Sequence, residues 1–262
     1  MYQTPARRVA AEALGTSFLL AAVVGSGIMA QRLAGADIAL ALLANTIATG
    51  AALLALILTF GPVSGAHFNP IVSLSSALNK DLDWKVFLFY CGAQVAGAVT
   101  GVMLANTMFG LPVISFSHNT RGGMEQLLSE FVASFGLVMV IAGASRHRSN
   151  AVAFAVAAYI SAAYWFTPST SFANPAVTIA RSLSDTFTGI APGSVLGFVL
   201  AQIVGGVTAT VVLRWLIPNE IHVRHGFTSK SASHLDRVST GSGSELVSDQ
   251  QAISPNDFDS HG

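Results

Sequence analysis

The chain has 262 residues, of which 52% are hydrophobic and only 10% are charged. Because a soluble domain usually carries about a quarter charged residues, this composition indicates an integral membrane protein. The 13 basic and 13 acidic residues give a formal net charge of zero, and no basic block indicates nucleic-acid binding. The single cysteine, Cys91, excludes an intrachain disulfide.

Six apolar stretches are long enough for transmembrane helices, which need about 20 residues each. Two further apolar segments, each beginning with Asn-Pro, have about half the length that a transmembrane helix needs. The six long stretches are about 8–30, 36–60, 84–106, 124–145, 150–167 and 192–217, and the two short ones are about 69–78 and 174–184. The sequence thus predicts a membrane domain over residues 1–221. The Ser-, Asp- and Gly-rich remainder, residues 222–262, predicts a disordered tail.

The distribution of Lys and Arg predicts how the chain is oriented, because cytoplasmic segments carry an excess of both. With the N-terminus inside, the cytoplasmic residues are Arg7, Arg8, Lys80, Lys85, Arg146, Arg148, Arg214, Arg224, Lys230 and Arg237, and the outer ones are Arg32, Arg121 and Arg181. We therefore expect both termini, and the tail, to be cytoplasmic.

The chain repeats itself, with half-repeats at about 8–106 and 124–217. The matching sequences are NPIVS at 69–73 with NPAVT at 174–178, AQVAGAVTGV at 93–102 with AQIVGGVTAT at 201–210, and AEALGTSFLLAAVV at 11–24 with SEFVASFGLVMVIA at 129–142. Each half holds three spans and one short segment. Since three is odd, the second half enters the membrane from the opposite side, which is an inverted repeat of the kind common in transport proteins.

The two Asn-Pro pairs predict helices that begin inside the membrane, because Asn is a favoured N-cap and Pro a favoured first helical residue. A helix too short to span must return on the side it entered, and its irregular loop is tolerated there only against protein or a watery cavity. We therefore expect these segments to line a pore and their N-termini to meet near the midplane. Each N-terminus carries roughly half a positive charge, which disfavours cations. The amide groups of Asn69 and Asn174 are expected to remain as donors to a passing solute.

The sequences SGAHFNPIVS, SFANPAVT, AEALGT and YCGAQVAGA resemble the aquaporin (major intrinsic protein) family over residues 10–217. The resemblance implies an all-α membrane protein with an aquaporin-like inverted repeat, six transmembrane helices and two re-entrant half-helices. It also implies a homotetramer in the plasma (inner) membrane, one pore per subunit for small uncharged solutes, and no cofactor. An Ile replaces the usual Ala of the first motif, and its effect on the pore centre stays open. The motif residues are Asn69, Pro70 and Ile71 in the first half and Asn174, Pro175 and Ala176 in the second.

The resemblance also implies a selectivity filter of four residues, one of which is an Arg directly after the second motif. Val177 occupies that position here, and the family's spacing places the other three at Thr49, Ala162 and Ser171. All four are small and uncharged, which predicts a widened filter. Arg181 lies one helical turn beyond Val177. It is expected either to place a displaced charge in the outer mouth or to tie down the outer loop.

Five polar residues are expected to support the re-entrant segments. Intramembrane carboxylates such as Glu12 and Glu130 are functional by default, but their matching places in the repeat favour a role as acceptors for loop backbone amides. Gln94 and Gln202 are expected to brace the same regions. His67 is interpreted as fastening its loop rather than as a gate.

These observations predict a passive channel for small uncharged solutes, whose widened filter conducts arsenite, methylated arsenicals, glycerol and water. In lacking the filter Arg, the chain resembles a branch of the family that is associated with arsenic resistance. One alternative is a general water and glycerol channel without a metalloid role. Another is a coupled secondary transporter, because such proteins also have inverted repeats and broken helices. An enzyme is not expected, since the sequence offers neither a partnered nucleophile nor a metal-ligand cluster.

Overall fold

The computed structural model describes residues 4–147 and 151–216, which form eight α-helices and contain no strand. The helices are α1 (Pro5–Ala34), α2 (Ile38–Ser64), α3 (Pro70–Leu78), α4 (Trp84–Met108), α5 (Met124–His147), α6 (Val152–Phe166), α7 (Pro175–Arg181) and α8 (Pro192–Leu216). They correspond one for one to the predicted segments, so the all-α prediction is confirmed. The predicted tail, residues 222–262, lies outside the described residues.

Five of the long helices, α1, α2, α4, α5 and α8, are long and apolar enough to cross a membrane. The sixth, α6, is also apolar but has only 15 residues, which corresponds to about 22 Å at 1.5 Å per residue. It ends at Phe166 because Thr167 precedes a proline and takes extended backbone angles, φ −117° and ψ 130°. A proline disfavours helical geometry in the residue before it, so α6 is shorter than the sequence predicts.

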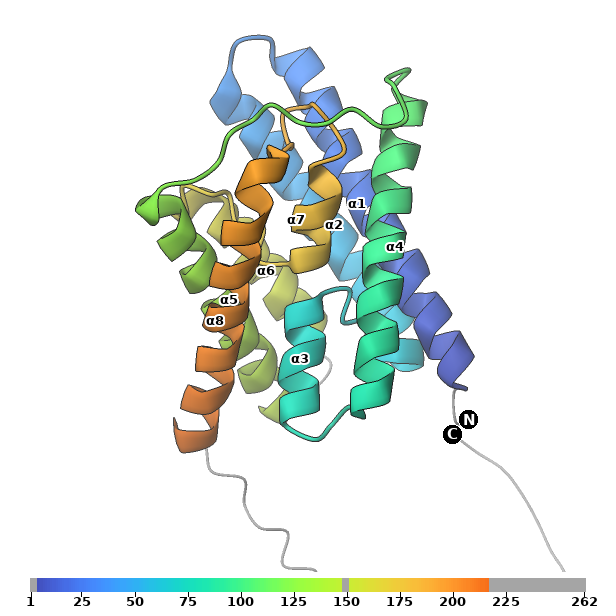
Figure 1. Cartoon of the computed structure of the whole chain (residues 1–262), viewed down its shortest axis with the longest axis vertical. Coiled ribbons are helices and arrows are strands. Elements are labelled where there is room, and N and C mark those ends of the chain that lie inside the picture. Colours follow the sequence, from blue (N-terminus) through green and yellow to red (C-terminus); the bar gives the residue numbers. More distant parts are fainter. Residues whose placement is uncertain (1–3, 148–150, 217–262) are drawn as a thin grey trace, which may run out of the picture. The chain divides into compact units, whose positions relative to one another are not determined.

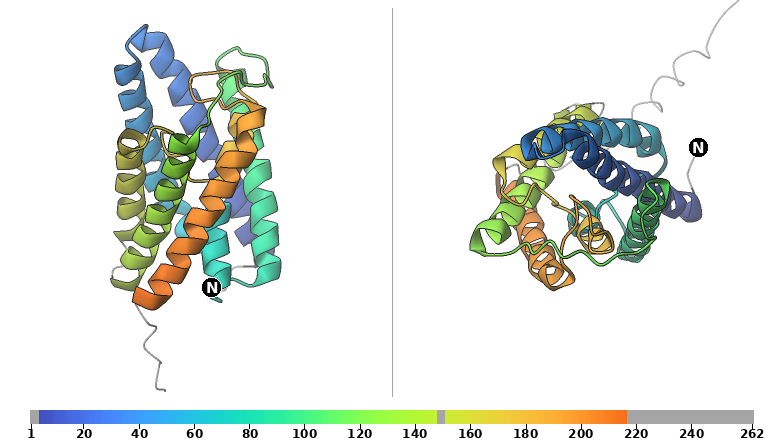
Figure 2. Two further views of the ribbon diagram at one scale, coloured as in Figure 1. Left: turned by 60° about the vertical axis from the view of Figure 1, so that its left-hand side comes forward. Right: turned by 90° about the horizontal axis from the view of Figure 1, so that it is seen from above.

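The two short helices lie inside a ring of the longer ones (Figures 1 and 2). In the first half α1 packs against α2 and α4, in the second half α5 packs against α6 and α8, and α2 contacts α6 across the halves. The N-terminal ends of α3 and α7 face each other, and their C-terminal ends point to opposite faces of the bundle (Figure 1). Helix α1 begins and α8 ends on the same face, as an even number of crossings requires.

Matching glycines bring the helices of each half close together. A Cβ atom at Gly97 of α4 would overlap the backbone carbonyl of Ala13 in α1, and one at Gly205 of α8 would overlap that of Phe131 in α5. Small residues at helix contacts let backbones approach closely in membranes, where van der Waals packing drives association. The inverted repeat therefore extends from the sequence to the packing of its helix pairs.

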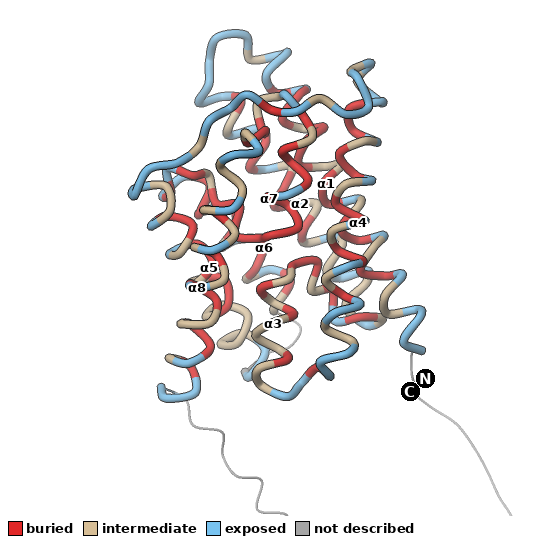
Figure 3. Tube along the Cα trace, viewed as in Figure 1, coloured by how far each residue is buried: buried red, intermediate tan, exposed pale blue. Residues whose placement is uncertain are grey.

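Burial follows the same arrangement. Buried residues concentrate where α3 and α7 meet, and exposed ones lie on the outer surface and the outer loops (Figure 3). Large apolar side chains such as Leu88, Leu196 and Trp215 are exposed on the outside of the bundle. An outer surface of this kind is suited to lipid or to neighbouring subunits rather than to water.

Candidate functional site

Asparagine caps begin both short helices. The Asn69 side chain accepts a hydrogen bond from the Ile71 backbone N–H at 2.9 Å. The Asn174 side chain accepts from the N–H groups of Ala176 and Val177, at 3.0 and 3.3 Å. Proline occupies the first position of each helix. The first backbone N–H groups of a helix have no partner within the helix. Each Asn accepts hydrogen bonds from some of these groups at a helix start that is buried in the bundle.

The same two asparagines join the halves of the molecule. The Asn69 amide donates to the Ala173 carbonyl at 2.7 Å, and the Asn174 amide donates to the Phe68 carbonyl at 2.8 Å. The sequence predicts that these amide groups face the solute, whereas each of them donates one hydrogen bond to the opposite loop. Because a side-chain amide carries two N–H groups, one donor on each Asn is left for the cavity that both residues line.

The loops that enter both short helices have the same unusual backbone. Ala66 and Phe68 precede Asn69 with φ of 49° and 48°, and Ser171 and Ala173 precede Asn174 with φ of 50° and 46°. A left-handed conformation costs a residue with a Cβ atom roughly 1–2 kcal/mol. Four such residues persist only where surrounding contacts hold them in place.

Glu12 supplies these contacts to the first loop. Its carboxylate accepts hydrogen bonds from the backbone N–H groups of His67 at 3.0 Å and Phe68 at 2.7 Å. It also accepts from the Ser64 hydroxyl at 2.6 Å and the Gln94 amide at 2.8 Å. A fully buried carboxylate needs such charge-assisted hydrogen bonds to offset its lost hydration. Glu12 therefore fixes the backbone just before Asn69.

Glu130 holds the second loop in the same way. It accepts from the backbone N–H groups of Phe172 at 2.9 Å and Ala173 at 2.8 Å, and from the Gln202 amide at 2.6 Å. The Gln202 amide also donates to the Thr178 hydroxyl at 2.8 Å. The two carboxylates thus hold matching backbone atoms, as their places in the repeat suggest.

His67 lies between the first loop and the cavity. Its Nδ1 atom is 3.0 Å from the Ser73 hydroxyl, and its ring packs edge-on against Tyr90 with centroids 5.5 Å apart. It also belongs to the cavity wall. These contacts hold the loop in place, and the same side chain also lines the pore.

One cavity of about 720 Å³ passes the two asparagines. Its wall extends from Asp81, beyond the C-terminal end of α3, to Arg181, at the C-terminal end of α7, so it runs along both short helices (Figure 1). Apolar residues from both halves form most of this wall: Leu19, Val23, Leu53, Ile57, Val72, Leu137, Ile141, Val156, Ile160 and Val177. Such a wall with few polar groups is typical of small-molecule sites.

Three of the four predicted filter residues, Thr49, Ser171 and Val177, line this cavity. Ala162 does not line it, because it lies on the exposed side of α6. Tyr164 faces the cavity instead and donates from its hydroxyl to Thr49 Oγ1 at 3.3 Å. Two residues turn an α-helix by roughly 200°, so Ala162 and Tyr164 lie on opposite sides of α6. The sequence predicted the wrong side of this helix to face the pore. The wall consequently contains an aromatic ring where a small residue was predicted.

Ile71 does not reshape the cavity. It is buried but lies outside the cavity wall, packed with Val138, Ala209 and Leu213. Gly206 of α8 leaves the necessary space, since a Cβ there would overlap Ile71 Cγ2. The exchange in the first motif therefore affects helix packing rather than the pore centre.

The family model for the major intrinsic proteins matches residues 2–151 and 144–249. The chain belongs to the major intrinsic protein family. This family consists of channels, not enzymes. The chain is 56% identical over 211 residues to the aquaglyceroporin AqpS of Rhizobium meliloti (strain 1021), covering 80% of this chain and 90% of the relative. It is 30% identical over 193 residues to aquaporin NIP1-3 of Oryza sativa subsp. japonica, covering 71% of this chain and 66% of the relative.

The fold of this major intrinsic protein is also found in a solved structure. The X-ray structure of the aquaglyceroporin from Plasmodium falciparum aligns with a TM-score of 0.60 and 20% identity, covering 82% of this chain and 98% of that one. At this identity the likeness establishes the aquaporin fold alone.

Across residues 4–147 and 151–216, no cluster of His, Cys, Asp and Glu is suited to hold a metal ion.

Two further residues of this major intrinsic protein line the cavity. Arg181 is only 3% exposed, belongs to the cavity wall, and donates from Nε to the Thr188 carbonyl in the loop after α7. Val72 also lines the cavity, although it was not predicted. The repeat offered the signal, because Val72 follows the first motif at the position that Val177 has after the second.

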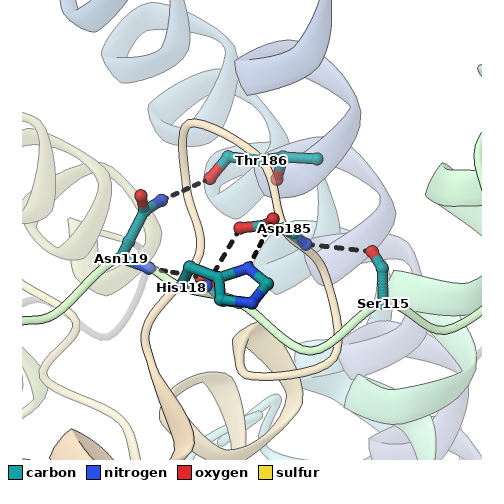
Figure 4. Close-up of polar contacts among 6 residues, drawn as sticks. Ser115, His118, Asn119, Asp185 and Thr186 are labelled. Atoms are coloured by element: carbon teal, nitrogen blue, oxygen red, sulfur yellow. Dashed lines mark hydrogen bonds and ion pairs between the residues drawn. The ribbon is translucent and has the colours of Figure 1, made fainter.

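A strap of hydrogen bonds between the loop before α5 and the loop after α7 holds the C-terminal end of α7 (Figure 4). The His118 backbone N–H and ring Nδ1 lie 3.0 and 2.9 Å from the Asp185 carboxylate oxygens. The Asp185 N–H donates to the Ser115 hydroxyl at 3.1 Å, and the Asn119 amide donates to the Thr186 carbonyl at 2.8 Å. Hydrogen bonds from the His118 backbone and ring lower the pKa of Asp185 below its ordinary value of 3.8. The loop before α5 is thereby tied to the loop after α7.

Proposed function

We propose that this protein is a passive channel for small uncharged solutes, conducting glycerol, water and neutral metalloid acids such as arsenous acid, together with methylated arsenicals. The observation that carries the proposal is the cavity of about 720 Å³ along both short helices, whose wall at the level of Asn69 and Asn174 offers amide donors between apolar surfaces. A neutral solute can exchange water for these donors, whereas a cation loses hydration without gaining an acceptor of equal strength.

The side chains that line the outer part of the cavity support solutes larger than water. Val177 puts a short apolar side chain where the family usually has Arg, and Thr49 and Ser171 add hydroxyls to the same wall. Tyr164 and Arg181 contribute bulk on the other sides, so the opening is less wide than four small residues would make it. A mixed apolar and hydroxylated wall suits a compact polyol or a trihydroxy acid of similar size.

The similarity to an aquaglyceroporin supports the glycerol part of the proposal. The metalloid part rests on the missing Arg and on the chemical likeness of arsenous acid to glycerol. A water and glycerol channel without a metalloid role is the alternative, and Tyr164 favours it because an aromatic residue narrows the opening.

We further propose a homotetramer in the plasma membrane, with both termini cytoplasmic. The exposed apolar side chains on the outside of the bundle support contacts with lipid and with other subunits. The orientation is supported by the excess of Lys and Arg on the face where α1 begins and α8 ends.

The test is a permeability panel on proteoliposomes that contain the full-length protein. Stopped-flow light scattering measures water, glycerol and urea, and uptake assays measure arsenite and methylarsenicals, all without an ion gradient. We expect the wild-type protein to conduct glycerol and arsenite. Val177→Arg should reduce both several-fold while sparing water, because a long charged side chain enters the cavity. Val177→Leu is the matched control, since it adds bulk without charge.

The panel separates the candidate functions. Water and glycerol flux without arsenite uptake would establish the alternative channel. Uptake that requires an ion gradient would indicate a coupled transporter, and permeability no higher than that of protein-free liposomes would overturn the proposal.

A further inference from the structure

Arg181 is a buried cation at the outer end of the cavity. It is the last residue of α7, lies one turn beyond Val177 and is 3% exposed. Its Nε–H donates to the Thr188 carbonyl, and its Cζ atom lies 3.5 Å from the centroid of the Phe172 ring. The side chain is thus fixed in place by a carbonyl on one side and an aromatic ring on the other.

No carboxylate pairs with this charge. In the part of the chain that the structure describes, the one ion pair is that between His118 and Asp185. A second cation packs on the same aromatic ring: Arg121 has its Cζ atom 5.1 Å from the Phe172 centroid. Burying an unpaired cation beside another is costly, and a neutral amide could make the bond to Thr188 equally well. A purely structural role therefore does not account for the charge.

Each of the two cations lines a different cavity. Arg181 belongs to the wall of the main cavity, and Arg121 to that of a second one of about 610 Å³ among the outer loops. Phe172, against which both are placed, lines the main cavity. A solute that passes between the outside and the asparagines would meet positive potential at this point.

Ser171 provides a second, independent sign of a ligand. It is 3% exposed and lines the cavity, yet its hydroxyl has no hydrogen-bond partner among residues 4–147 and 151–216. Arg181 likewise uses one N–H of its guanidinium within the same residues, although a guanidinium carries five. Buried polar groups are nearly always paired, so these unused groups on the wall of the same cavity are suited to a solute.

We infer that Arg181 and Ser171 form the outer recognition point of the pore and that the charge of Arg181 is its barrier to cations. Arg181 thus supplies, one helical turn beyond Val177, a positive charge that Val177 itself cannot supply. The solute class is a small uncharged molecule with at least two oxygens, one accepting from the guanidinium and another exchanging a hydrogen bond with the Ser171 hydroxyl. This inference deepens the proposed channel function and rests on it.

Variants at both positions, in proteoliposomes, test the two parts separately. The measurements are water flux, the glycerol-to-water permeability ratio, and Na⁺ conductance from the collapse of a potential. Arg181→Met keeps most of the side-chain volume, Arg181→Lys keeps the charge but not the planar set of donors, and Ser171→Ala removes the hydroxyl. Arg32→Met is the matched control, because Arg32 also stacks on a phenylalanine, 5.2 Å from the Phe109 centroid, and donates to a backbone carbonyl, but lies outside both cavities.

We expect Arg181→Met to raise Na⁺ conductance at least about tenfold, because a charge in a poorly screened site is removed. The glycerol-to-water ratio should fall by about tenfold, since a hydrogen bond to a charged group is lost. Arg181→Lys and Ser171→Ala should lower the ratio and keep Na⁺ excluded. Arg32→Met should change neither quantity.

An Arg181→Met channel that still excludes Na⁺ and keeps the wild-type ratio would overturn the inference and leave Arg181 a structural residue. If that variant does not fold, unchanged ratios in both Arg181→Lys and Ser171→Ala would overturn it equally. Failure of the proposed function is seen separately, because the wild-type protein itself would then conduct neither glycerol nor water.

Discussion

At the scale of single residues, the unusual Ile71 of the first motif is matched by a glycine on another helix. A Cβ at Gly206 would overlap Ile71 Cγ2, so the isoleucine uses space that the glycine leaves. In the repeat, Ile71 of the first half corresponds to Ala176 of the second, and Gly206 of the second half corresponds to Ala98 of the first. One pair across the halves thus combines a large and a small residue, where the repeat-related pair combines two residues of intermediate size. The pair explains how the motif tolerates an isoleucine without a change in the cavity.

Gly206→Ala should therefore destabilise the protein by about 1–3 kcal/mol, the usual cost of overpacking a core. Ile71→Ala alone should cost about 2 kcal/mol or more, because it leaves a void. The double variant places alanine at both positions, as in the repeat-related residues Ala98 and Ala176, and it should cost less than the two single changes together. Unfolding midpoints in detergent measure these differences, and glycerol flux should stay unchanged because neither residue lines the cavity.

Gly143→Ala is the control for this cycle, since a Cβ at Gly143 of α5 would meet nothing within 4 Å. It should leave the midpoint nearly unchanged. Strict additivity of the Ile71 and Gly206 variants would show that the two side chains do not compete for the same space.

At the scale of elements, the loop before α5 holds the end of α7 through exposed polar bonds, and one of these bonds depends on pH. The pKa of Asp185 lies below its ordinary 3.8, because His118 donates to its charged form. A carboxyl with a depressed pKa contributes stability above its unfolded pKa, and this contribution is lost as the pH falls through the folded value. The strap should therefore be complete at neutral pH and weaken in acid.

We expect Asp185→Asn to lower the melting temperature at pH 7 by at most about 2–4 °C, because exposed ion pairs contribute little. The difference from wild type should shrink as the pH falls below 3.8, since the asparagine resembles the protonated aspartate. Differential scanning fluorimetry of the detergent-purified protein at several pH values measures this. Asp37→Asn, a change at the N-cap of α2 where both residues cap equally well, should have no effect. A difference that persists unchanged in acid would assign the stabilisation to another interaction.

At the scale of the whole molecule, the inverted repeat made most of the architecture predictable. The Asn-Pro starts of α3 and α7 and the ends of the long helices follow from capping, proline and apolar length, which are local properties. The positions of Glu12 and Glu130 opposite the two loops follow from repetition, because matching residues must meet matching partners.

The rest depended on tertiary packing. The side of α6 that faces the cavity, with Tyr164 rather than Ala162, is set by how α6 packs against α2 and α5. The direction of Ile71 depends on a glycine in α8, far along the chain. The depth of Arg181 depends on Phe172 and Thr188, neither of which carries a charge that would reveal a partner. Nothing in the local sequence encodes these three features.

The two halves are held together at the pore centre by the bonds of Asn69 and Asn174 to opposite loops, and this predicts that the two residues act as a unit. Asn69→Ala and Asn174→Ala should each destabilise the protein by about 2 kcal/mol, since each loses a helix cap and one bond across the junction. Once one bond is lost the loops can separate, which weakens the other. The double variant should therefore cost less than the sum, by on the order of 1 kcal/mol.

A second pair of N-caps separates this coupling from ordinary capping. The side chains of Asp37 and Asp83 accept from the Leu40 and Lys85 backbone N–H groups at 2.9 and 2.8 Å, at opposite ends of the bundle. Alanine at both should cost the sum of the single changes, because the two caps share no partner. If the Asn69 and Asn174 variants add just as simply in unfolding midpoints, the bonds across the centre do not couple the halves. The halves would then be held together by helix packing, of α2 against α6, α4 against α7 and α3 against α8.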